Sequence, residues 1–352
     1  MRSDMLEERA EEELIKCLKQ VPFAAIEPMV ERGNNSGRCP DLQYTLSTPD
    51  FDQHLIVEVK STGQPKPVRE GVNQLLRYKE LYPDSYGIIA APFISSRSAS
   101  ICTKEGVGYL DFAGNCYLSF QRVFIRVEGR PNPFSQHRGL RSLYAPKASR
   151  ILRVLLSNPM DRVWKVKELS KESDVSIGHV SNVKRLLDER EWIEDYEVGF
   201  SLSDPSALLQ EWSENYSYRK NRVRDFYSLL AISEIEPRIA EVCMEANSKY
   251  ALTGFSGAAR LAPTVRYQRA MSYIGGNIDD LSQLLELKEV GSGANVSLLE
   301  PYDKGVLYGC EEQNGILVAS PIQVYLDLKG FRGRGEEAAE ALLEQVMMPK
   351  WQ

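Results

Sequence analysis

Three charged side chains near the N-terminus have the types and spacing that phosphodiester hydrolysis requires. Asp41 stands in a run of strand-forming residues over 40–46, and Glu58 and Lys60 end a second such run over 54–60. Because side chains alternate across a strand, Glu58 and Lys60 lie on the same face. Carboxylates are the hard oxygen ligands that Mg²⁺ prefers, and a lysine beside a metal-bound water can orient it or assist its deprotonation. We therefore predict a Mg²⁺ site that hydrolyses phosphodiesters.

A helix predicted over 68–81 adds two side chains to this set. Gln74 and Tyr78 are four residues apart, so they lie on one face of that helix. From that face they can brace Lys60 or reach a DNA backbone.

Taken in order, Pro40-Asp41, Glu58-Val59-Lys60 and the pair Gln74 and Tyr78 resemble the PD-(D/E)xK nuclease superfamily, including the Q-x-x-x-Y element of its RecB-like branch. The resemblance implies a restriction-endonuclease-like domain with a mixed sheet. It also implies that Asp41, Glu58, Lys60, Gln74 and Tyr78 are catalytic and that Asp41 and Glu58 bind the metal.

The resemblance gives the first helix a role as well, because a first-helix glutamate sometimes joins the metal site in that superfamily. Glu13 flanks the apolar stripe of a helix predicted over 6–21 and is the better-placed metal ligand there. Two plainer interpretations stay open. Glu13 can be a solvated acid, and the whole motif can be a surface ion pair in a domain that does not cleave DNA and needs no Mg²⁺.

Residues 1–128 have the pattern of a single α/β domain. The nearly continuous apolar run over 86–93 is typical of a strand that is covered on both faces in the middle of a sheet. Residues 129–145 are rich in Pro, Gly, Ser and Arg, which is typical of a linker.

Short helices and a turn follow the linker. A helix is predicted over 176–189 after the turn at Asp174, with a hairpin over 192–202 behind it. The apolar residues assigned to one face of this helix are Ile177, Val180, Val183, Leu186 and Leu187. This order resembles a winged helix-turn-helix over 146–204, whose second helix enters the major groove. The residues expected to contact DNA are Ser176, His179, Ser181, Asn182, Lys184 and Arg185.

The charge distribution is uneven. The chain of 352 residues has a net charge of -6, yet residues 147–190 hold ten Lys or Arg against six Asp or Glu. This local excess suits phosphate contacts in an otherwise acidic protein. Four acids at 191, 194, 195 and 197 argue against insertion of the hairpin into a minor groove. Winged helices also serve as protein-interaction modules, and that alternative stays open.

The bulk properties exclude several classes of protein. Six cysteines form no C-x-x-C pair and only three histidines are present, so a zinc site is not expected. No apolar run approaches the roughly 20 residues that a membrane span needs, and the acidic start is unlike a secretory signal. We expect a cytoplasmic protein.

A second resemblance lies in the C-terminal part. The segments 319–329 and 333–340 resemble the AbiEi family of type IV toxin-antitoxin antitoxins. With the winged helix, the resemblance covers roughly residues 146–347. It implies an α+β domain over 205–352 and a bacterial transcriptional regulator that binds operator repeats and opposes a nucleotidyltransferase toxin. The chain departs from the short form of that family because the nuclease-like domain precedes it.

Two functions follow from these patterns. The first is a DNA-binding regulator, whose expected partners are DNA, a nucleotidyltransferase-like toxin and a second copy of the chain. The second is a Mg²⁺-dependent deoxyribonuclease that the winged helix delivers to DNA. We rank the regulator first because its resemblance covers more of the chain. One further helix is expected over 206–230. Its aromatic and basic residues could contact nucleic acid, although aromatics at helical spacing more often belong to a core.

Overall fold

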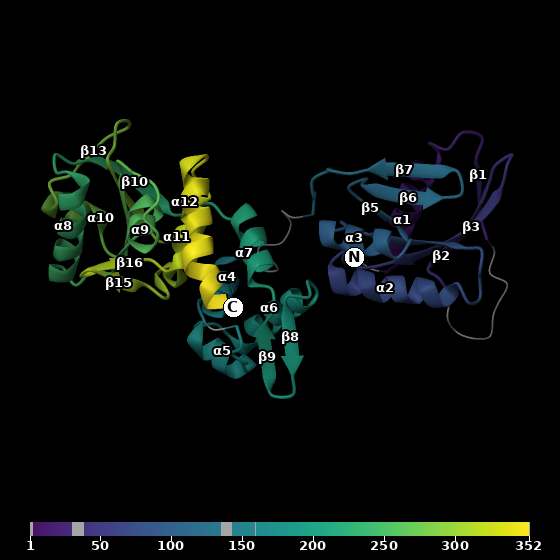
Figure 1. Cartoon of the computed structure of the whole chain (residues 1–352), viewed down its shortest axis with the longest axis horizontal. Coiled ribbons are helices and arrows are strands. Elements are labelled where there is room, and N and C mark those ends of the chain that lie inside the picture. The colour runs from purple at the N-terminus through teal and green to yellow at the C-terminus, as the bar shows by residue number, and fades with distance from the viewer. Residues whose placement is uncertain (1–2, 30–38, 135–142, 159, 352) are drawn as a thin grey trace. The chain divides into compact units, whose positions relative to one another are not determined.

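The computed structural model describes residues 3–29, 39–134, 143–158 and 160–351. The chain forms two compact units, residues 1–139 with 188–191 and residues 140–187 with 192–352. We call them the N-terminal unit and the C-terminal unit. Both are mixed α/β structures, and each contains a seven-stranded sheet (Figure 1).

The sheet of the N-terminal unit has its strands in sequence order. Its strands are β1 (Ala25–Pro28), β2 (Leu42–Ser47), β3 (Asp52–Val59), β4 (Tyr86–Ala91), β5 (Gly108–Asp111), β6 (Cys116–Phe120) and β7 (Val123–Val127). The three central strands β3, β4 and β5 are parallel, and the outer pairs are antiparallel. All six residues of β4 are buried, which confirms the central strand that its apolar run predicts.

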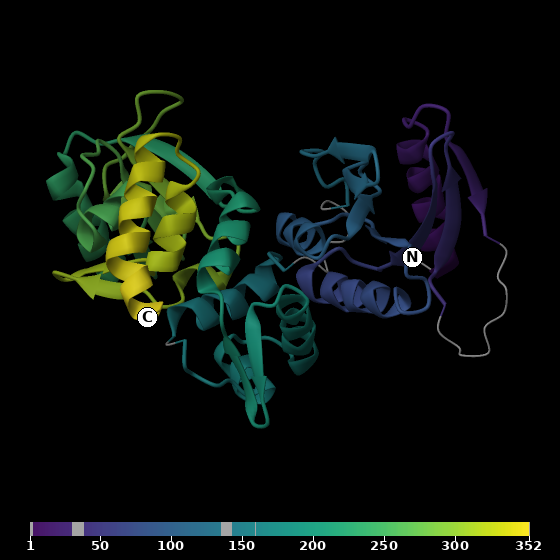
Figure 2. The same ribbon diagram turned by 45° about the vertical axis from the view of Figure 1, so that its right-hand side comes forward.

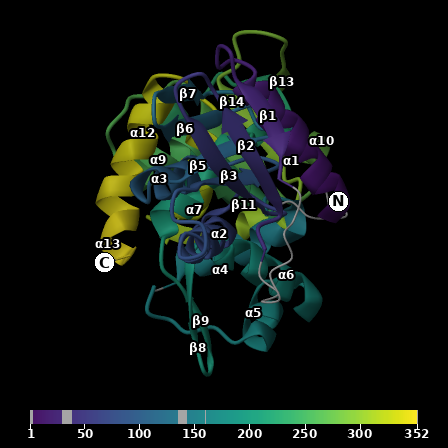
Figure 3. The same cartoon turned by 90° about the vertical axis from the view of Figure 1, so that its right-hand side faces the viewer.

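Helices cover both faces of this sheet. Helix α1 (Ser3–Leu18) packs Leu14 against Leu55 and Val57 of β3 on one face. Helices α2 (Pro65–Tyr78) and α3 (Ser96–Lys104) pack on the other face, where Val72 lies in one cluster with Ile56. Figure 3 shows α1 and α2 on opposite sides of the sheet. Residues 55 to 57 of β3 therefore alternate between two cores.

Helix α2 begins earlier than its apolar periodicity predicts. Pro65 is its first residue, a position where the missing N–H needs no partner and the fixed backbone angle suits a helix. The helix ends at Tyr78, so it carries Gln74 and Tyr78 in its last two turns.

The C-terminal unit begins with three helices and a hairpin. These are α4 (Pro146–Ser157), α5 (Val166–Glu172), α6 (Ile177–Asp188), β8 (Ile193–Tyr196) and β9 (Gly199–Leu202). The hairpin, in teal, extends beyond the helices beside it (Figure 2). Asp174 has a φ of 50° in the turn between α5 and α6.

The second sheet follows helix α7 (Pro205–Glu214). Its strands lie in the order β13 (Lys288–Glu289), β10 (Arg222–Tyr227), β14 (Val296–Glu300), β12 (Ala270–Ile274), β11 (Tyr250–Leu252), β16 (Ile316–Val318) and β15 (Glu311–Gln313). The remaining helical elements are η1 (Tyr218–Lys220), α8 (Ile232–Glu245), α9 (Gly254–Leu261), α10 (Ile278–Leu284), η2 (Lys304–Leu307), α11 (Pro321–Leu328), α12 (Arg334–Leu342), η3 (Leu343–Met347) and α13 (Met348–Trp351).

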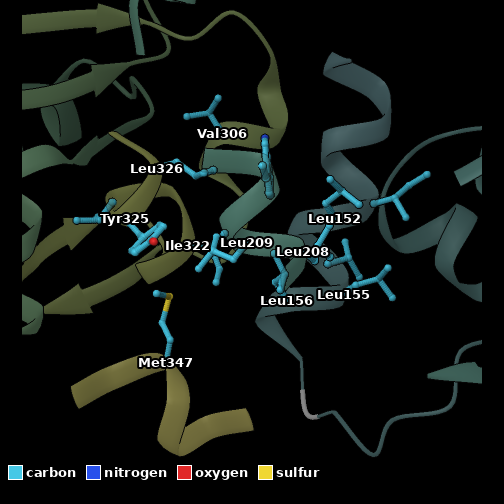
Figure 4. Packing of buried hydrophobic residues seen from close by; sticks show 14 of the residues in the cluster. Leu152, Leu155, Leu156, Leu208, Leu209, Val306, Ile322, Tyr325, Leu326 and Met347 are labelled. Atoms are coloured by element: carbon cyan, nitrogen blue, oxygen red, sulfur yellow. The ribbon is translucent and has the colours of Figure 1, made fainter. Parts of the chain in front are cut away.

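One hydrophobic cluster joins the first helices of this unit to its sheet domain. Leu152 and Leu155 of α4 belong to it together with Leu208 of α7 and Ile322 of α11 (Figure 4). The opposite face of the sheet packs against α8 and α10 in a separate cluster. Helix α4 is therefore anchored to the domain that follows it in sequence.

The helix expected over 206–230 is wrong after residue 214. Helix α7 ends at Glu214, and Arg222–Tyr227 forms strand β10 between β13 and β14. Phe226 is 1% exposed within this sheet. In this strand Arg222, Arg224 and Phe226 lie on one face, and pairing with the neighbouring strands decides between that arrangement and a helix.

The side chain of Ile177 also differs from expectation. It is assigned to the core face of its helix by periodicity, yet it is 53% exposed. Val180 and Val183 on the same stripe are buried. Ile177 is the first residue of α6, so it projects past the end of the core.

None of the helices in the part of the chain that the structure describes is long and apolar enough to cross a membrane.

Candidate active site and nucleic-acid interface

The ammonium group of Lys60 is the centre of the site in the N-terminal unit. Lys60 follows the last residue of β3, and its Nζ donates to Oε2 of Glu58 at 2.7 Å and to Oε1 of Gln74 at 2.5 Å. Its side chain is 17% exposed, and that of Glu58 is 3% exposed. Both groups lie on the α2 side of the sheet, because the residues that alternate with them face α1.

Helix α2 leaves space for the Lys60 side chain because residue 71 is a glycine. A Cβ atom built on Gly71 would lie 2.6 Å from Cε of Lys60. Gly71, Gln74 and Tyr78 are spaced three and four apart, so they share the face that meets the lysine. Gly71 is absent from the site residues predicted from the sequence. A glycine inside a predicted helix is the signal that could have found it, because glycine weakens a helix by about 1 kcal/mol relative to alanine.

Asp41 is held at the end of β3 by the backbone. It directly precedes β2, and its Oδ2 accepts a hydrogen bond of 2.7 Å from the N–H of Val59. The pairing of Leu42 with Val57 sets this register. Asp41 is exposed, whereas Glu58 beside it is buried.

The surroundings shift the pKa values of two groups in the site. Burial raises the pKa of the Glu58 carboxyl above its ordinary value, the hydrogen bond from Lys60 opposes this rise, and the charge of Asp41 adds to it. Burial, followed by the charge of Glu58, raises the pKa of Tyr78 to about 12. Tyr78 therefore keeps its proton at neutral pH, and its hydroxyl donates to the carbonyl oxygen of Cys39 at 3.1 Å.

Few side chains at this site could serve as metal ligands. Asp41 and Glu58 are its two carboxylates, and among the described residues no group of three or more His, Cys, Asp or Glu side chains could hold a metal ion. Mg²⁺ is commonly held by one or two protein carboxylates and several waters. Asp41 and Glu58 therefore fit Mg²⁺ by chemistry, and they do not fit a metal that needs a complete protein cage.

Glu13 lies elsewhere. It is on α1, which covers the other face of the sheet, and it forms an ion pair of 3.3 Å with Lys16. Glu13 lines a small pocket together with Asp111 and Asn115. The structure thus brings Asp41, Glu58, Lys60, Gln74 and Tyr78 together and leaves Glu13 apart from them.

The second candidate site is the outer face of α6. Ser176, Ser181 and Arg185 are exposed there, at or near the positions opposite the buried Val180, Val183 and Leu187. The half-buried candidates on the same helix are His179, Asn182 and Lys184.

Two of the basic side chains on α6 already have partners. Arg185 donates to Oδ1 of Asn182 at 3.1 Å. Lys184 forms an ion pair of 2.5 Å with Asp195 on the hairpin, and its Nζ lies 5.3 Å from the centre of the Phe200 ring. Lys184 must therefore leave Asp195, or share it, to contact a phosphate.

Comparison with known proteins finds a family match in the C-terminal part. Residues 201–348 match a family described as "Transcriptional regulator, AbiEi antitoxin, Type IV TA system". The match begins in β9 and extends through η3 to the first residue of α13, so the N-terminal unit lies outside it. No curated protein matches the chain.

Two solved structures show a distant similarity. They are titled "Structure of EndoMS in apo form" and "Structure of EndoMS-dsDNA2 complex", and each is 20% identical to this chain with a TM-score of 0.20. The similarity covers 29% of this chain and 45% and 43% of those chains, which is less than half of their length. A TM-score this low gives no support to a shared fold.

Proposed function

We propose that this protein is a DNA-binding transcriptional regulator of the type IV toxin-antitoxin kind. The match of residues 201–348 to the AbiEi antitoxin family carries the proposal. The proposed division is a nuclease-like domain over 1–128, a linker over 129–145, a winged helix-turn-helix over 146–204 and the antitoxin-like domain over 205–352. The proposed protein partners are a nucleotidyltransferase-like toxin and a second copy of the chain.

DNA binding is assigned to α6 in this proposal. The order α4, α5, α6, β8, β9 supports a winged helix, and the exposed polar face of α6 supports its insertion into the major groove. Arg185 is the strongest base-reading candidate, because arginine can make two parallel hydrogen bonds to guanine.

The test is fluorescence anisotropy with DNA from the region upstream of the protein's own coding sequence, over a range of salt concentrations. The full chain should bind with an affinity that falls steeply as salt rises. Arg185→Ala should weaken specific binding about tenfold, in line with roughly 1–3 kcal/mol for one good base contact. Lys288→Ala is the matched control, because Lys288 is an exposed cation on β13. Equal binding by Arg185→Ala and wild type would refute the assignment to α6.

A second function rests on a specific observation: the Lys60 ammonium is held by hydrogen bonds to Glu58 of β3 and Gln74 of α2. In this function Asp41 and Glu58 would hold Mg²⁺, which would supply the Lewis acidity for phosphodiester hydrolysis. Lys60 would orient the attacking water. Gln74 and Glu58 fix the Lys60 ammonium through their hydrogen bonds, and Tyr78 holds the segment before Asp41 through its hydrogen bond to the carbonyl oxygen of Cys39.

The test of this second function is a cleavage assay on linear, supercoiled and single-stranded DNA with Mg²⁺ or Mn²⁺. Asp41→Ala and Lys60→Ala should each abolish cleavage, and Lys104→Ala, an exposed substitution on α3, should not. Cleavage that survives in both site variants would point to a contaminating nuclease. Absence of cleavage on every substrate, with DNA binding intact, would leave the regulator as the function of the whole chain.

A further inference from the structure

The C-terminal unit contains a cavity of about 520 Å³ beside the turn that leads into α6. Five segments line it: α4, the end of α5 with the turn after it, the residues entering β11, η2 with the loop that follows, and strand β16. The volume lies in the range of roughly 300–1,000 Å³ that small-molecule sites occupy. None of the residues that line it is among the candidate site residues described above.

The walls of the cavity are mainly apolar. Leu307 and Leu317 line it together with the rings of Tyr250 and Tyr308. Tyr250 is 6% exposed, so one wall is a buried ring with little freedom to move. Such a surface favours an aromatic or branched apolar body over a sugar or a free phosphate.

The two acids that line the cavity have partners among its own side chains. Asp174 pairs with Arg150 at 3.3 Å and with Lys304, which neutralise its charge. Glu172 keeps its negative charge and accepts a hydrogen bond of 2.9 Å from the hydroxyl of Tyr308.

One cation is left over. Lys249 lines the cavity, is exposed, and has no ion-pair partner among the residues that the structure describes. The hydroxyl of the neighbouring Ser248 is buried and has no hydrogen-bond partner within the described part of the chain. An anionic group placed here would meet a free ammonium, and the unsatisfied hydroxyl beside it is a further donor.

We propose that this cavity binds a small organic anion with an apolar, preferably aromatic, body. The anionic group lies at Lys249, and the apolar body packs against Leu307, Leu317 and the Tyr250 ring. The ligand is a carboxylate or sulfonate of a size that about 520 Å³ can hold.

Occupancy of the cavity acts on α6 through Asp174. This residue lines the cavity, holds the left-handed backbone of the turn before α6, and accepts a hydrogen bond of 3.1 Å from Arg150 at its carbonyl oxygen. A ligand packed against this turn stabilises the conformation that it contacts, because binding to one state raises the population of that state. The effect on DNA affinity rests on the proposed regulatory function, whereas ligand binding does not.

The experiment uses 8-anilinonaphthalene-1-sulfonate, a fluorescent probe with an aromatic body and one sulfonate, on the full chain. We expect saturable binding with one site and displacement by salicylate. Lys249→Ala should weaken binding about fivefold, because it removes the charge-assisted contact to the sulfonate and such a contact is weaker at an exposed lysine than at a buried one. Lys288→Ala is the control and should bind like wild type.

Leu317→Trp fills the cavity and should abolish binding. If that variant does not fold, Lys249→Ala and its control decide the outcome. Hydrogen exchange of the amides in residues 170–176 should slow when the probe binds to wild type. The proposal is overturned if the probe does not saturate, or if Lys249→Ala and Leu317→Trp bind as wild type does. Neither readout contains DNA, so failure of DNA binding would not be mistaken for failure of this site.

Discussion

The end of β3 in the N-terminal unit and the outer face of α6 in the C-terminal unit hold their polar side chains in different ways. Lys60 is 17% exposed and contacts side chains from a strand and a helix. Arg185 is exposed, and its contact with Asn182 is to the same helix. A buried charged side chain with hydrogen bonds to two different elements keeps a fixed position, which catalysis requires. Exposed side chains on a single helix can change conformation when a partner binds. The first arrangement suits catalysis and the second suits recognition.

The largest expected difference between the two regions is the effect of a substitution on stability. Lys60→Met leaves the Glu58 carboxylate buried without its cation, and we expect a loss of about 3 kcal/mol in the free energy of unfolding of the N-terminal unit. Arg185→Ala should change the stability of its own unit by less than about 0.5 kcal/mol.

The two units can be followed separately. All four tryptophans, Trp164, Trp192, Trp212 and Trp351, lie in the C-terminal unit, so tryptophan fluorescence reports its unfolding in urea. Labelling of the buried Cys102 thiol reports unfolding of the N-terminal unit. The double variant Lys60→Met with Glu58→Gln should regain part of the loss, because it removes the unpaired charge. Equal stability of Lys60→Met and wild type would contradict the buried ion pair.

The stability of the N-terminal unit should depend on pH through Glu58. The pKa of Glu58 is raised from its ordinary value of 4.5, chiefly by burial. The folded state therefore binds this proton more tightly than the unfolded chain does. The stability that this group contributes is fully present below pH 4.5 and is lost as the pH rises through the folded pKa.

The measurement is the urea midpoint for Cys102 labelling between pH 4.5 and 8, in wild type and in Glu58→Gln. The variant should show a weaker fall in midpoint with rising pH. Parallel curves for the two proteins would show that Glu58 titrates as it does in the unfolded chain.

Two glycines offer a matched test of packing. A Cβ on Gly71 would lie 2.6 Å from Cε of Lys60 and 2.8 Å from Cδ1 of Ile89, whereas a Cβ on Gly178 in α6 would meet nothing within 4 Å. Alanine gains about 1 kcal/mol over glycine inside a helix, and overpacking costs roughly 1–3 kcal/mol. Gly71→Ala should therefore lower the stability of its unit by up to about 2 kcal/mol, and Gly178→Ala should leave stability unchanged or raise it slightly.

Cys102 labelling measures the first variant, and tryptophan fluorescence measures the second. A stabilised Gly71→Ala protein would mean that Lys60 can move aside freely, which would weaken the case for a fixed catalytic lysine.

Local patterns predicted the elements of the site but not the face of the sheet to which each belongs. The strand positions of Glu58 and Lys60 follow from alternation, and the spacing of Gln74 and Tyr78 follows from the helical period. Glu13 has the right residue type on the right kind of helix. Periodicity cannot tell which face of a sheet an amphipathic helix covers, and α1 covers the face that Glu58 does not occupy.

Two other predictions, the helix over 206–230 and the burial of Ile177, are wrong for related reasons. Arg222–Tyr227 forms a strand because β13 and β14 pair with it, and those partners follow about 60 to 80 residues later in the chain. Ile177 is exposed because the core ends before the first turn of α6, although its helical phase is that of buried residues. In both cases, the outcome depends on tertiary contacts that are absent from the local sequence.

The smallest effect concerns the ion pair between Lys184 of α6 and Asp195 of the hairpin. Lys184 and Asp195 are 30% and 53% exposed, so breaking their pair should change stability by less than about 0.5 kcal/mol. Asp195→Ala should nevertheless raise DNA affinity about two- to threefold, because Lys184 becomes available to a phosphate. Each added phosphate contact should also steepen the dependence of log affinity on log salt by about 0.9.

Glu197→Ala separates this effect from a simple change of net charge. Glu197 is an exposed acid at the tip of the same hairpin, and its removal changes the net charge equally without releasing Lys184. Anisotropy titrations at several salt concentrations should show a steeper slope only for Asp195→Ala. If both variants gain affinity to the same extent with the same slope, the long-range field of the hairpin limits binding, and Lys184 makes no phosphate contact. If only Asp195→Ala gains, the hairpin acid restrains a DNA-contacting lysine on α6 through a direct ion pair.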